Sequence, residues 1–266
     1  MDGGASDNNL KGELMYFRSL LVASGLVALA TVADAQSPTP LMSMPRLAPG
    51  GAPKILVRAD SIKHGHAIPS EYAFCTADGT GGAAAAANKS PRISWSKGPK
   101  STKSYAVFVY DTDSPGEHRE WMNQKDHTLT AAIKRKIFFH MAVVDIPANV
   151  AELPEGAESD ARVIHGKQAP AKVGVHAANS FTQIFATNEA LKGTYYGYDG
   201  PCSPWNDDNV HHYHFAVYAL NVPSLDLYGD FSGEAAVAAM EGKVVAQGEL
   251  LGVYSTNPAL AAKVKK

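Results

Sequence analysis

The chain has 266 residues, of which 45% are hydrophobic and 19% are charged, as is usual for a folded soluble protein with one large domain or two small ones. Its formal net charge is −2 and its basic residues form only short runs, which argues against a protein that binds nucleic acid or anionic membranes through a basic surface. We therefore expect no nucleic-acid partner.

Residues 1–35 have the pattern of a secretory signal peptide. Arg18 precedes an apolar stretch at 20–30, and small residues at 33–35 stand where cleavage usually occurs. The stretch is shorter than the roughly 20 residues that span a bilayer, so we expect no permanent membrane span, with an uncleaved anchor as the alternative. The acidic segment before Met15 fits a signal poorly, and Met15 is an alternative start. We expect a secreted or periplasmic protein.

The segment after the signal, residues 36–53, is rich in Pro, Ser and Gly and predicts a flexible linker, so the folded domain is expected over 54–262. The chain has two cysteines, Cys75 and Cys202. In an exported protein an even pair favours a disulfide over free thiols.

Short runs with strand character follow one another along the domain, at 54–60, 92–96, 104–111, 136–147, 211–220 and 243–254. One helix is predicted over 232–243, with Ser232 as its N-cap. The polar stretch 116–135 is expected to be an excursion between two core strands. Many strands and few helices predict a mainly β, sandwich-like domain with peripheral helices.

The run "HHYHFAVYAL" at 211–220 carries three histidines and a tyrosine at its start. Side chains alternate between the faces of a strand, so His211 shares a face with Tyr213 while His212 shares the other with His214. A zinc site needs three or four converging ligands, and two on each face are too few. We therefore predict no metal and no cofactor.

Two further strands carry titratable residues. The strand at 104–111 is predicted to stop at Asp111, and Asp111 and Asp113 could simply cap the following turn. His140 lies in an apolar run, where a buried ring needs a hydrogen-bond partner, and such a histidine is more often structural than functional. Together with His211, however, these residues stand near strand ends beside turns, where loops assemble sites on a rigid scaffold.

The chain resembles the phosphatidylethanolamine-binding protein family over residues 54–256, and within it the bacterial branch of Raf-kinase-inhibitor-like proteins. The resemblance rests on motifs in the family's order: "YDTDSP", "HMAVVDIPA", "YYGYDGPCSPW", "HHYHFAVYAL" and "AAVAAMEGKVVAQGELLGVY". It implies a large antiparallel sheet packed on a smaller one, one or two helices near the C-terminus, and an anion-binding cavity at one end of the sheet.

The resemblance also implies the residues that line this cavity: Asp111, Asp113, His140, Pro201, His211 and Tyr213. The histidines would donate to a phosphate-like group, and the two acids would orient them. Such anions are then expected to bind more weakly as the pH rises through the histidine range. Two departures from the family matter here. The longer segment 116–136 could form a lid or partner surface, and Phe138-Phe139 stand where the family often has Trp just before the histidine, which alters one wall.

The leading hypothesis is an exported protein, not an enzyme, that binds a small phosphate-bearing or carboxylate ligand. One alternative is a hydrolase that uses Asp111 with His140 or His211 as its base. Another is an inhibitor of a protease or kinase that acts through the cavity rim. A protein partner and a homodimer are left open.

Overall fold

The computed structural model describes residues 43–44, 53–170 and 173–264. The predicted signal peptide lies outside the described residues, and of the predicted linker 36–53 only Ser43, Met44 and Pro53 are described. Met44 is buried and packs into an apolar cluster of the domain, so the predicted linker contacts the core at this position. None of the described helices is long and apolar enough to cross a membrane.

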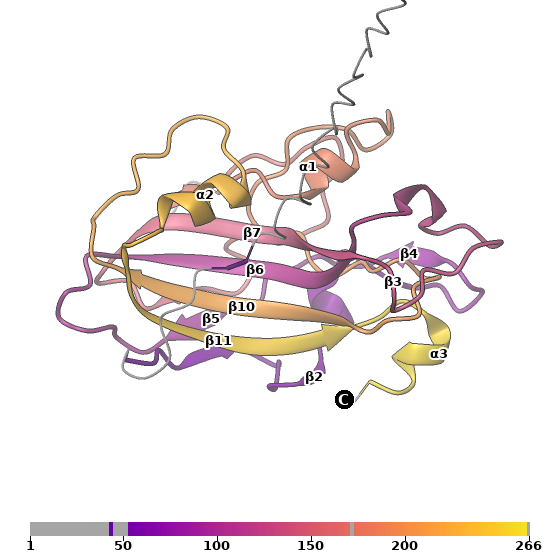
Figure 1. Cartoon of the computed structure of the whole chain (residues 1–266), viewed down its shortest axis with the longest axis horizontal. Helices are drawn as coiled ribbons and strands as arrows, with labels where there is room; N and C mark the ends of the chain where they lie inside the picture. Colours follow the sequence, from indigo (N-terminus) through magenta and orange to yellow (C-terminus); the bar gives the residue numbers. More distant parts are fainter. Residues whose placement is uncertain (1–42, 45–52, 171–172, 265–266) are drawn as a thin grey trace, which may run out of the picture. The chain divides into compact units, whose positions relative to one another are not determined.

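The large sheet has six strands in the order β2-β11-β10-β6-β7-β9 (Figure 1). In that order they are β2 (His66–Ala67), β11 (Val244–Tyr254), β10 (His211–Leu220), β6 (Ser104–Pro115), β7 (Arg135–Pro147) and β9 (Val175–His176). The pairs are antiparallel except β2 with β11, which is parallel.

The remaining described strands form a smaller antiparallel sheet and a hairpin. The sheet joins β1 (Val57–Ala59), β5 (Ile93–Trp95) and β8 (Glu152–Leu153), and the hairpin pairs β3 (Cys75–Ala77) with β4 (Ala83–Ala85). The prediction of a mainly β fold with a large and a smaller sheet is confirmed.

Helices are short and few in the described chain. They are α1 (Phe181–Ile184), α2 (Gly233–Ala239), α3 (Pro258–Ala261) and the 3-10 turns η1 (Ser70–Tyr72) and η2 (Arg119–Trp121). The predicted cap of α2 is present, because the Ser232 side chain accepts a hydrogen bond from the Ala235 N–H. Figure 1 shows α2 lying along β7, where it covers one face of the large sheet.

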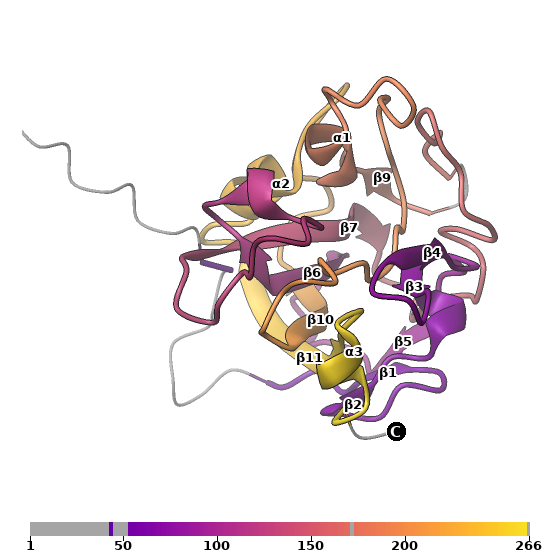
Figure 2. The ribbon, with the colours of Figure 1, turned by 90° about the vertical axis from the view of Figure 1, so that its right-hand side faces the viewer.

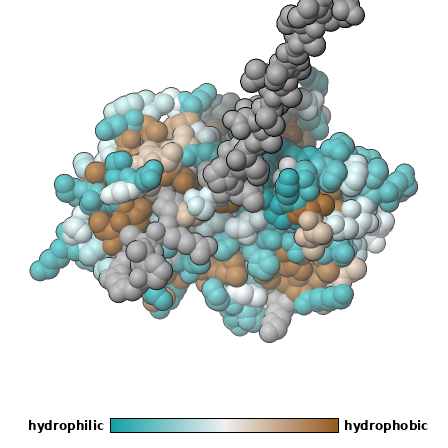
Figure 3. Space-filling model, viewed as in Figure 1, coloured by the Kyte–Doolittle hydropathy of each residue, from teal (hydrophilic) through white to brown (hydrophobic). Residues whose placement is uncertain are grey.

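Both faces of the large sheet are buried. On β6 the residues 105, 107 and 109 pack toward the small sheet, while 106, 108 and 110 pack toward α2. Strands buried on both sides read as unbroken apolar runs, which is why the sequence of β6 shows little alternation. The space-filling view of this side shows hydrophobic patches among hydrophilic residues (Figure 3).

The predicted end of β6 at Asp111 is wrong. The strand continues to Pro115, with a register irregularity between Asp111 and Ser114. Within it, the Asp113 N–H donates to Asp111 Oδ1 at 2.7 Å, the local bond expected for a turn. Residues two apart share a face only in a regular strand, so this bulge allows Asp111 and Asp113 to point to different surroundings.

Candidate functional site

Three neighbouring strands of the large sheet supply the centre of the site. Tyr213 on β10 lies opposite Asp111 on β6, and Asp111 in turn lies opposite Phe138 on β7. Residues directly opposite on adjacent strands point to the same face of the sheet. The end of β6 therefore meets the beginnings of β7 and β10, at the end of the sheet that faces the viewer in Figure 2.

A cavity of about 350 Å³ opens at this end of the sheet. Its lining comes from the three strands, α1, and segments on either side of them: Asp111, Ser114, Pro115, Arg119, Met122, Asn123, Phe138, His140, Phe181, Ile184, Phe185, Asn188, Cys202, Ser203, Pro204, His211 and Tyr213. Four of the six predicted site residues are in this lining. Asp113 and Pro201 are not.

His211 lies between two buried carboxylates. Its Nδ1 is 2.6 Å from Asp111 Oδ2 and its Nε2 is 3.2 Å from Asp207 Oδ2. Burial disfavours a charged ring, but the two carboxylates outweigh it and raise the pKa of His211 to about 10. The imidazolium thus donates both of its N–H groups to the protein at neutral pH. Arg135 binds both oxygens of the same Asp207 carboxylate, with Nη1 at 2.6 Å from Oδ2 and Nη2 at 3.0 Å from Oδ1.

His140 has the opposite character. Its Nδ1 lies 2.6 Å from the backbone carbonyl oxygen of Asp199, and because a carbonyl only accepts, Nδ1 carries the proton. Burial lowers the pKa of His140 to about 4. The neutral ring then carries a lone pair on Nε2. The bond that fixes the His140 ring is made to the backbone carbonyl of Asp199, and not to Asp111 or Asp113, which the resemblance implied as the orienting acids.

Asp199, which supplies this carbonyl, is itself fixed by a buried polar network. Its carboxylate accepts hydrogen bonds from Lys167 Nζ at 2.9 Å, from Asn88 at 2.8 Å and from Asn179 at 2.8 Å. Burial raises the pKa of Asp199 and lowers that of Lys167, while their mutual attraction opposes both shifts. The network holds the backbone on which the orientation of His140 depends.

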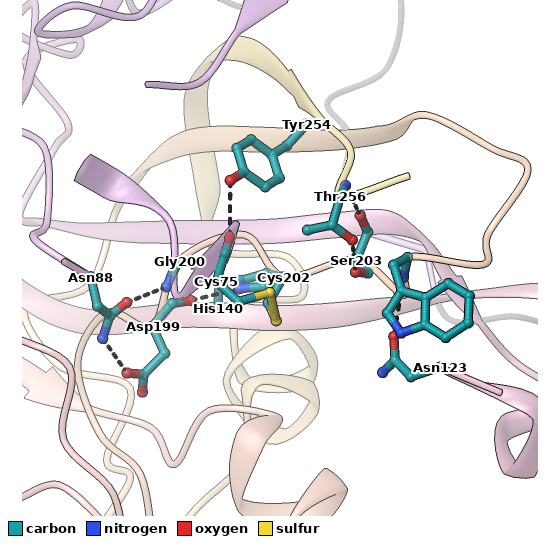
Figure 4. The surroundings of a disulfide bond; sticks show 11 residues. Cys75, Asn88, Asn123, His140, Asp199, Gly200, Cys202, Ser203, Tyr254 and Thr256 are labelled. Carbon is teal, nitrogen blue, oxygen red and sulfur yellow. Dashed lines mark hydrogen bonds between the residues drawn. A yellow bond between two sulfur atoms is a disulfide. The ribbon is translucent and has the colours of Figure 1, made fainter. Parts of the chain in front are cut away.

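The backbone around Cys202 forms one wall of the cavity and is joined to β3 (Figure 4). Cys202 forms a disulfide with Cys75, 127 residues away in sequence. The Pro201 carbonyl accepts the N–H groups of Phe74 and Cys75, so Pro201 connects this segment to β3 rather than facing the cavity. Figure 4 also shows the Gly200 N–H donating to Asn88.

Asp113, near the end of β6, bonds His212 of β10 and is not in the cavity lining. Its Oδ2 lies 2.9 Å from both the backbone nitrogen and Nδ1 of His212, whose side chain is 44% exposed. Although burial opposes ionisation, the bonds to His212 hold the pKa of Asp113 at about 2. His214 lies on the same face and pairs with Glu249 at 3.0 Å. The alternation read from the sequence therefore separates His212 and His214 from the cavity.

The buried Tyr213 ring packs against His140, with 5.1 Å between ring centroids. Burial, with Asp111 nearby, holds the pKa of Tyr213 well above its usual range. Its phenol therefore keeps its proton and can donate a hydrogen bond. In the described chain no three His, Cys, Asp or Glu side chains converge as a metal site would require.

The segment 116–134 between β6 and β7 forms another wall through Arg119, Met122 and Asn123. Asn206 holds it in place: its Oδ1 accepts from the Asn123 N–H at 2.8 Å, and its Nδ2 donates to the carbonyls of Trp121, Gln124 and His127. The Trp121 ring also stacks between His118 and His127. These contacts connect the segment to Asn206, and three of its residues form part of the cavity wall.

Sequence reasoning missed several of these residues. Asp207 carried a weak signal, because it lies four residues before His211 in the acidic stretch "NDDN". Asp199 lies within the motif "YYGYDGPCSPW", but nothing in the motif indicates that its carbonyl bonds His140. Arg119 and Arg135 carried no signal that distinguishes them from ordinary polar residues.

The chain is similar to known proteins over most of its length. The model of the family described as "Phosphatidylethanolamine-binding protein" matches residues 58–255. The chain belongs to this family. Among curated relatives, the UPF0098 protein YbcL of Escherichia coli is 30% identical to this chain over 198 residues. The aligned part covers 74% of this chain and 86% of the relative. A UPF0098 protein of Aquifex aeolicus is 30% identical over 194 residues, 73% of this chain and 84% of the relative.

Solved structures in the phosphatidylethanolamine-binding protein family have the same fold. The crystal structure of Escherichia coli YbcL, described as a new member of the mammalian family, aligns with a TM-score of 0.54 at 27% identity and covers 76% of this chain and 99% of that one. A homologue from Chlamydia trachomatis aligns with a TM-score of 0.51 at 24% identity, over 76% of this chain and 97% of its own. The second likeness supports the fold alone.

Proposed function

We propose that the protein binds a small anionic organic ligand, phosphate-bearing or carboxylate, in the cavity at the end of the large sheet. The observation that carries the proposal is the composition of this cavity. Polar groups of β6, β7 and β10 converge on it, and its volume of about 350 Å³ lies in the range of small-molecule sites. Membership of the phosphatidylethanolamine-binding protein family supports the same location.

Binding does not require the imidazoles to release or take up a proton. His211 is charged and spends both N–H groups on carboxylates, so it contributes fixed charge rather than free donors. The Tyr213 hydroxyl is a neutral donor in the lining, and the Ser203 hydroxyl is another, because its oxygen accepts from the Thr256 N–H while its proton is available.

A hydrolase is less well supported by the same groups. A general base should have a pKa near the working pH. The pKa of His140, lowered to about 4, makes it a weak base, and that of His211, raised to about 10, keeps it protonated. Inhibition of a protease or kinase through the cavity rim has no specific observation in its favour.

Export is the second part of the proposal. The signal-like residues 1–35 lie outside the described residues, but the link between Cys75 and Cys202 supports an oxidising compartment. Fractionation of cells that express the full chain, with thiol labelling of the purified protein, tests this. Retention in the cytoplasm with both thiols free would contradict it.

Calorimetry with phenyl phosphate and with phosphorylethanolamine tests the binding site. Tyr213→Phe removes one hydroxyl from the lining, and we expect it to weaken binding about 10-fold, as the loss of a hydrogen bond to a charged group does. Tyr105→Phe, which removes a buried hydroxyl of β6 that bonds Gly98, is the matched control and should bind as the wild type does. No binding by the wild type at millimolar ligand would remove the proposal.

A further inference from the structure

Arg119 carries a charge that the rest of the cavity does not neutralise. Within the part of the chain that the structure describes, its guanidinium forms no hydrogen bond and no ion pair, although the side chain is half-buried in the cavity lining. A guanidinium offers five N–H donors in a planar fork that matches the oxygens of a phosphate or carboxylate.

The other charges of the lining are balanced within the protein. Asp111 and His211 neutralise each other at 2.6 Å, and behind them Asp207 is neutralised by Arg135 at 2.6 Å. His140 is neutral because burial keeps its pKa at about 4. Arg119 is therefore the side chain that gives the described lining its net positive charge, and an anion entering the cavity meets no competing partner for it.

Lys136 reinforces this charge. Burial lowers the pKa of Lys136, and the positive charge of Arg119 lowers it further, so the two cations lie within electrostatic range of each other. Lys136 precedes Phe138 by two residues on β7, which places both side chains on the same face of a regular strand. Glu234 acts in the opposite sense on Lys136.

The remaining lining is largely apolar. Its five largest apolar side chains come from the segment 116–134, from β7 and from α1 with the residue after it: Met122, Phe138, Phe181, Ile184 and Phe185. The rings of Phe138 and Phe181 are 5.2 Å apart and perpendicular, and those of Phe181 and Phe185 are 5.3 Å apart. Inorganic phosphate would leave this apolar surface uncovered, whereas an aromatic or branched substituent would bury it.

We propose that Arg119 is the specificity-determining residue of the cavity, and that the ligand is an amphiphilic organic phosphate whose anionic group binds this guanidinium while an apolar or aromatic group lies among the five apolar side chains. The assignment rests on the proposed function and deepens it. Arg119 comes from the segment that Asn206 holds in place, so its backbone is positioned before a ligand arrives.

The experiment is calorimetry of the full chain with three probes: phenyl phosphate, inorganic phosphate and benzyl alcohol. We expect the wild type to bind phenyl phosphate at least about 10-fold more tightly than inorganic phosphate, because the ring is buried. Arg119→Gln should weaken phenyl phosphate about 10- to 100-fold and leave benzyl alcohol unchanged, since only the charge-assisted bonds are lost.

Two further variants make the result specific. Lys125→Gln removes the same charge from an exposed position of the same segment and should leave binding unchanged. Arg119→Lys should recover only part of the affinity, because an ammonium cannot form the paired bonds of a guanidinium. The affinity of the wild type should fall with added salt, and that dependence should be weaker in Arg119→Gln.

The outcomes separate the two proposals. If the wild type binds phenyl phosphate and Arg119→Gln binds it equally well, Arg119 is not the specificity residue, although the cavity is still the site. If inorganic phosphate binds as tightly as phenyl phosphate, the apolar part of the inference is wrong. If the wild type binds neither phosphate, the proposed function fails with it.

Discussion

The carboxylate of Asp111 lies 2.6 Å from Nδ1 of His211, and both side chains are almost fully buried. Asp207 holds the other ring nitrogen, so the imidazolium has an acid on each side. Removing one member of a buried group of charges lowers the free energy of unfolding, because the remaining charges stay buried without a partner. Asp111, His211 and Asp207 should therefore contribute to the stability of the fold, and Asp111 and His211 also line the cavity.

Replacing His211 with Gln should cost about 3–5 kcal/mol of unfolding free energy, the usual effect of leaving buried charges without a partner. His212→Gln is the matched control, because its pair with Asp113 is partly exposed and should contribute about 0–1 kcal/mol. Urea unfolding at pH 7 compares them. Equal destabilisation by the two variants would show that the buried group is not held as described.

The same pair predicts how stability depends on alkaline pH. A pKa raised from about 6.5 to about 10 on folding means that His211 contributes its full stabilisation below pH 6.5 and loses it as the pH rises through 10. The wild type should therefore lose more stability than His211→Gln between pH 7 and 10. If the unfolding free energies of the two proteins, measured in urea, changed by the same amount over this range, the raised pKa would be contradicted.

His140 predicts the opposite dependence. Its pKa falls to about 4 on folding, so the neutral ring contributes stability above about pH 6.5 that is lost as the pH falls through 4. His140→Gln has no such titration, and the stability gap between wild type and variant should narrow on acidification. Histidine side-chain NMR provides an independent check, and a midpoint near 6.5 for this ring would refute the assignment.

The affinity for an anion of constant charge should be nearly independent of pH between 5.5 and 8. Neither cavity imidazole titrates in that range, because the pKa of His140 lies below it and that of His211 above it. This replaces the sequence-based expectation of weaker binding as the pH rises. Calorimetry should use phenyl sulfate, whose charge is constant, and a change of more than about 10-fold, or 1.4 kcal/mol, would restore the earlier expectation.

The disulfide should be a major contributor to stability. It closes a loop of 127 residues, and the chain-entropy model assigns about 4–5 kcal/mol to loops of this order. The double variant Cys75→Ser with Cys202→Ser should unfold at lower urea concentration, and a reductant should destabilise the wild type but not the variant. A reductant-sensitive variant, or a wild type insensitive after full reduction, would contradict this.

Asn206 should control the order of the segment 116–134. Asn206→Ala removes the bonds to Trp121, Gln124 and His127, and we expect faster tryptic cleavage after Lys125 together with weaker phosphate binding. Asn188→Ala, which alters another polar residue of the lining outside that segment, is the control for cleavage. An unchanged cleavage rate in Asn206→Ala would show that other contacts hold the segment.

The sequence by itself determined the features that depend on local repetition and order. The long strands could be read from their apolar runs, and the alternation within β10 separated His211 and Tyr213 from His212 and His214, as the structure has it. The order of the motifs identified the family. Each of these signals is carried by residues close together in the chain.

Only the tertiary structure decided the charges and the partners of the site. The bulge after Asp111 allows Asp111 and Asp113 to point to different surroundings. The Asp199 carbonyl bonds His140 although the two residues are 59 positions apart in the chain. Arg119 lines the cavity on a segment that Asn206 bonds. Strand periodicity is local, whereas register, bulges and burial arise from contacts between distant segments, and these contacts set each pKa. Hence the residues near the site were predictable, but their protonation and the identity of the unpaired cation were not.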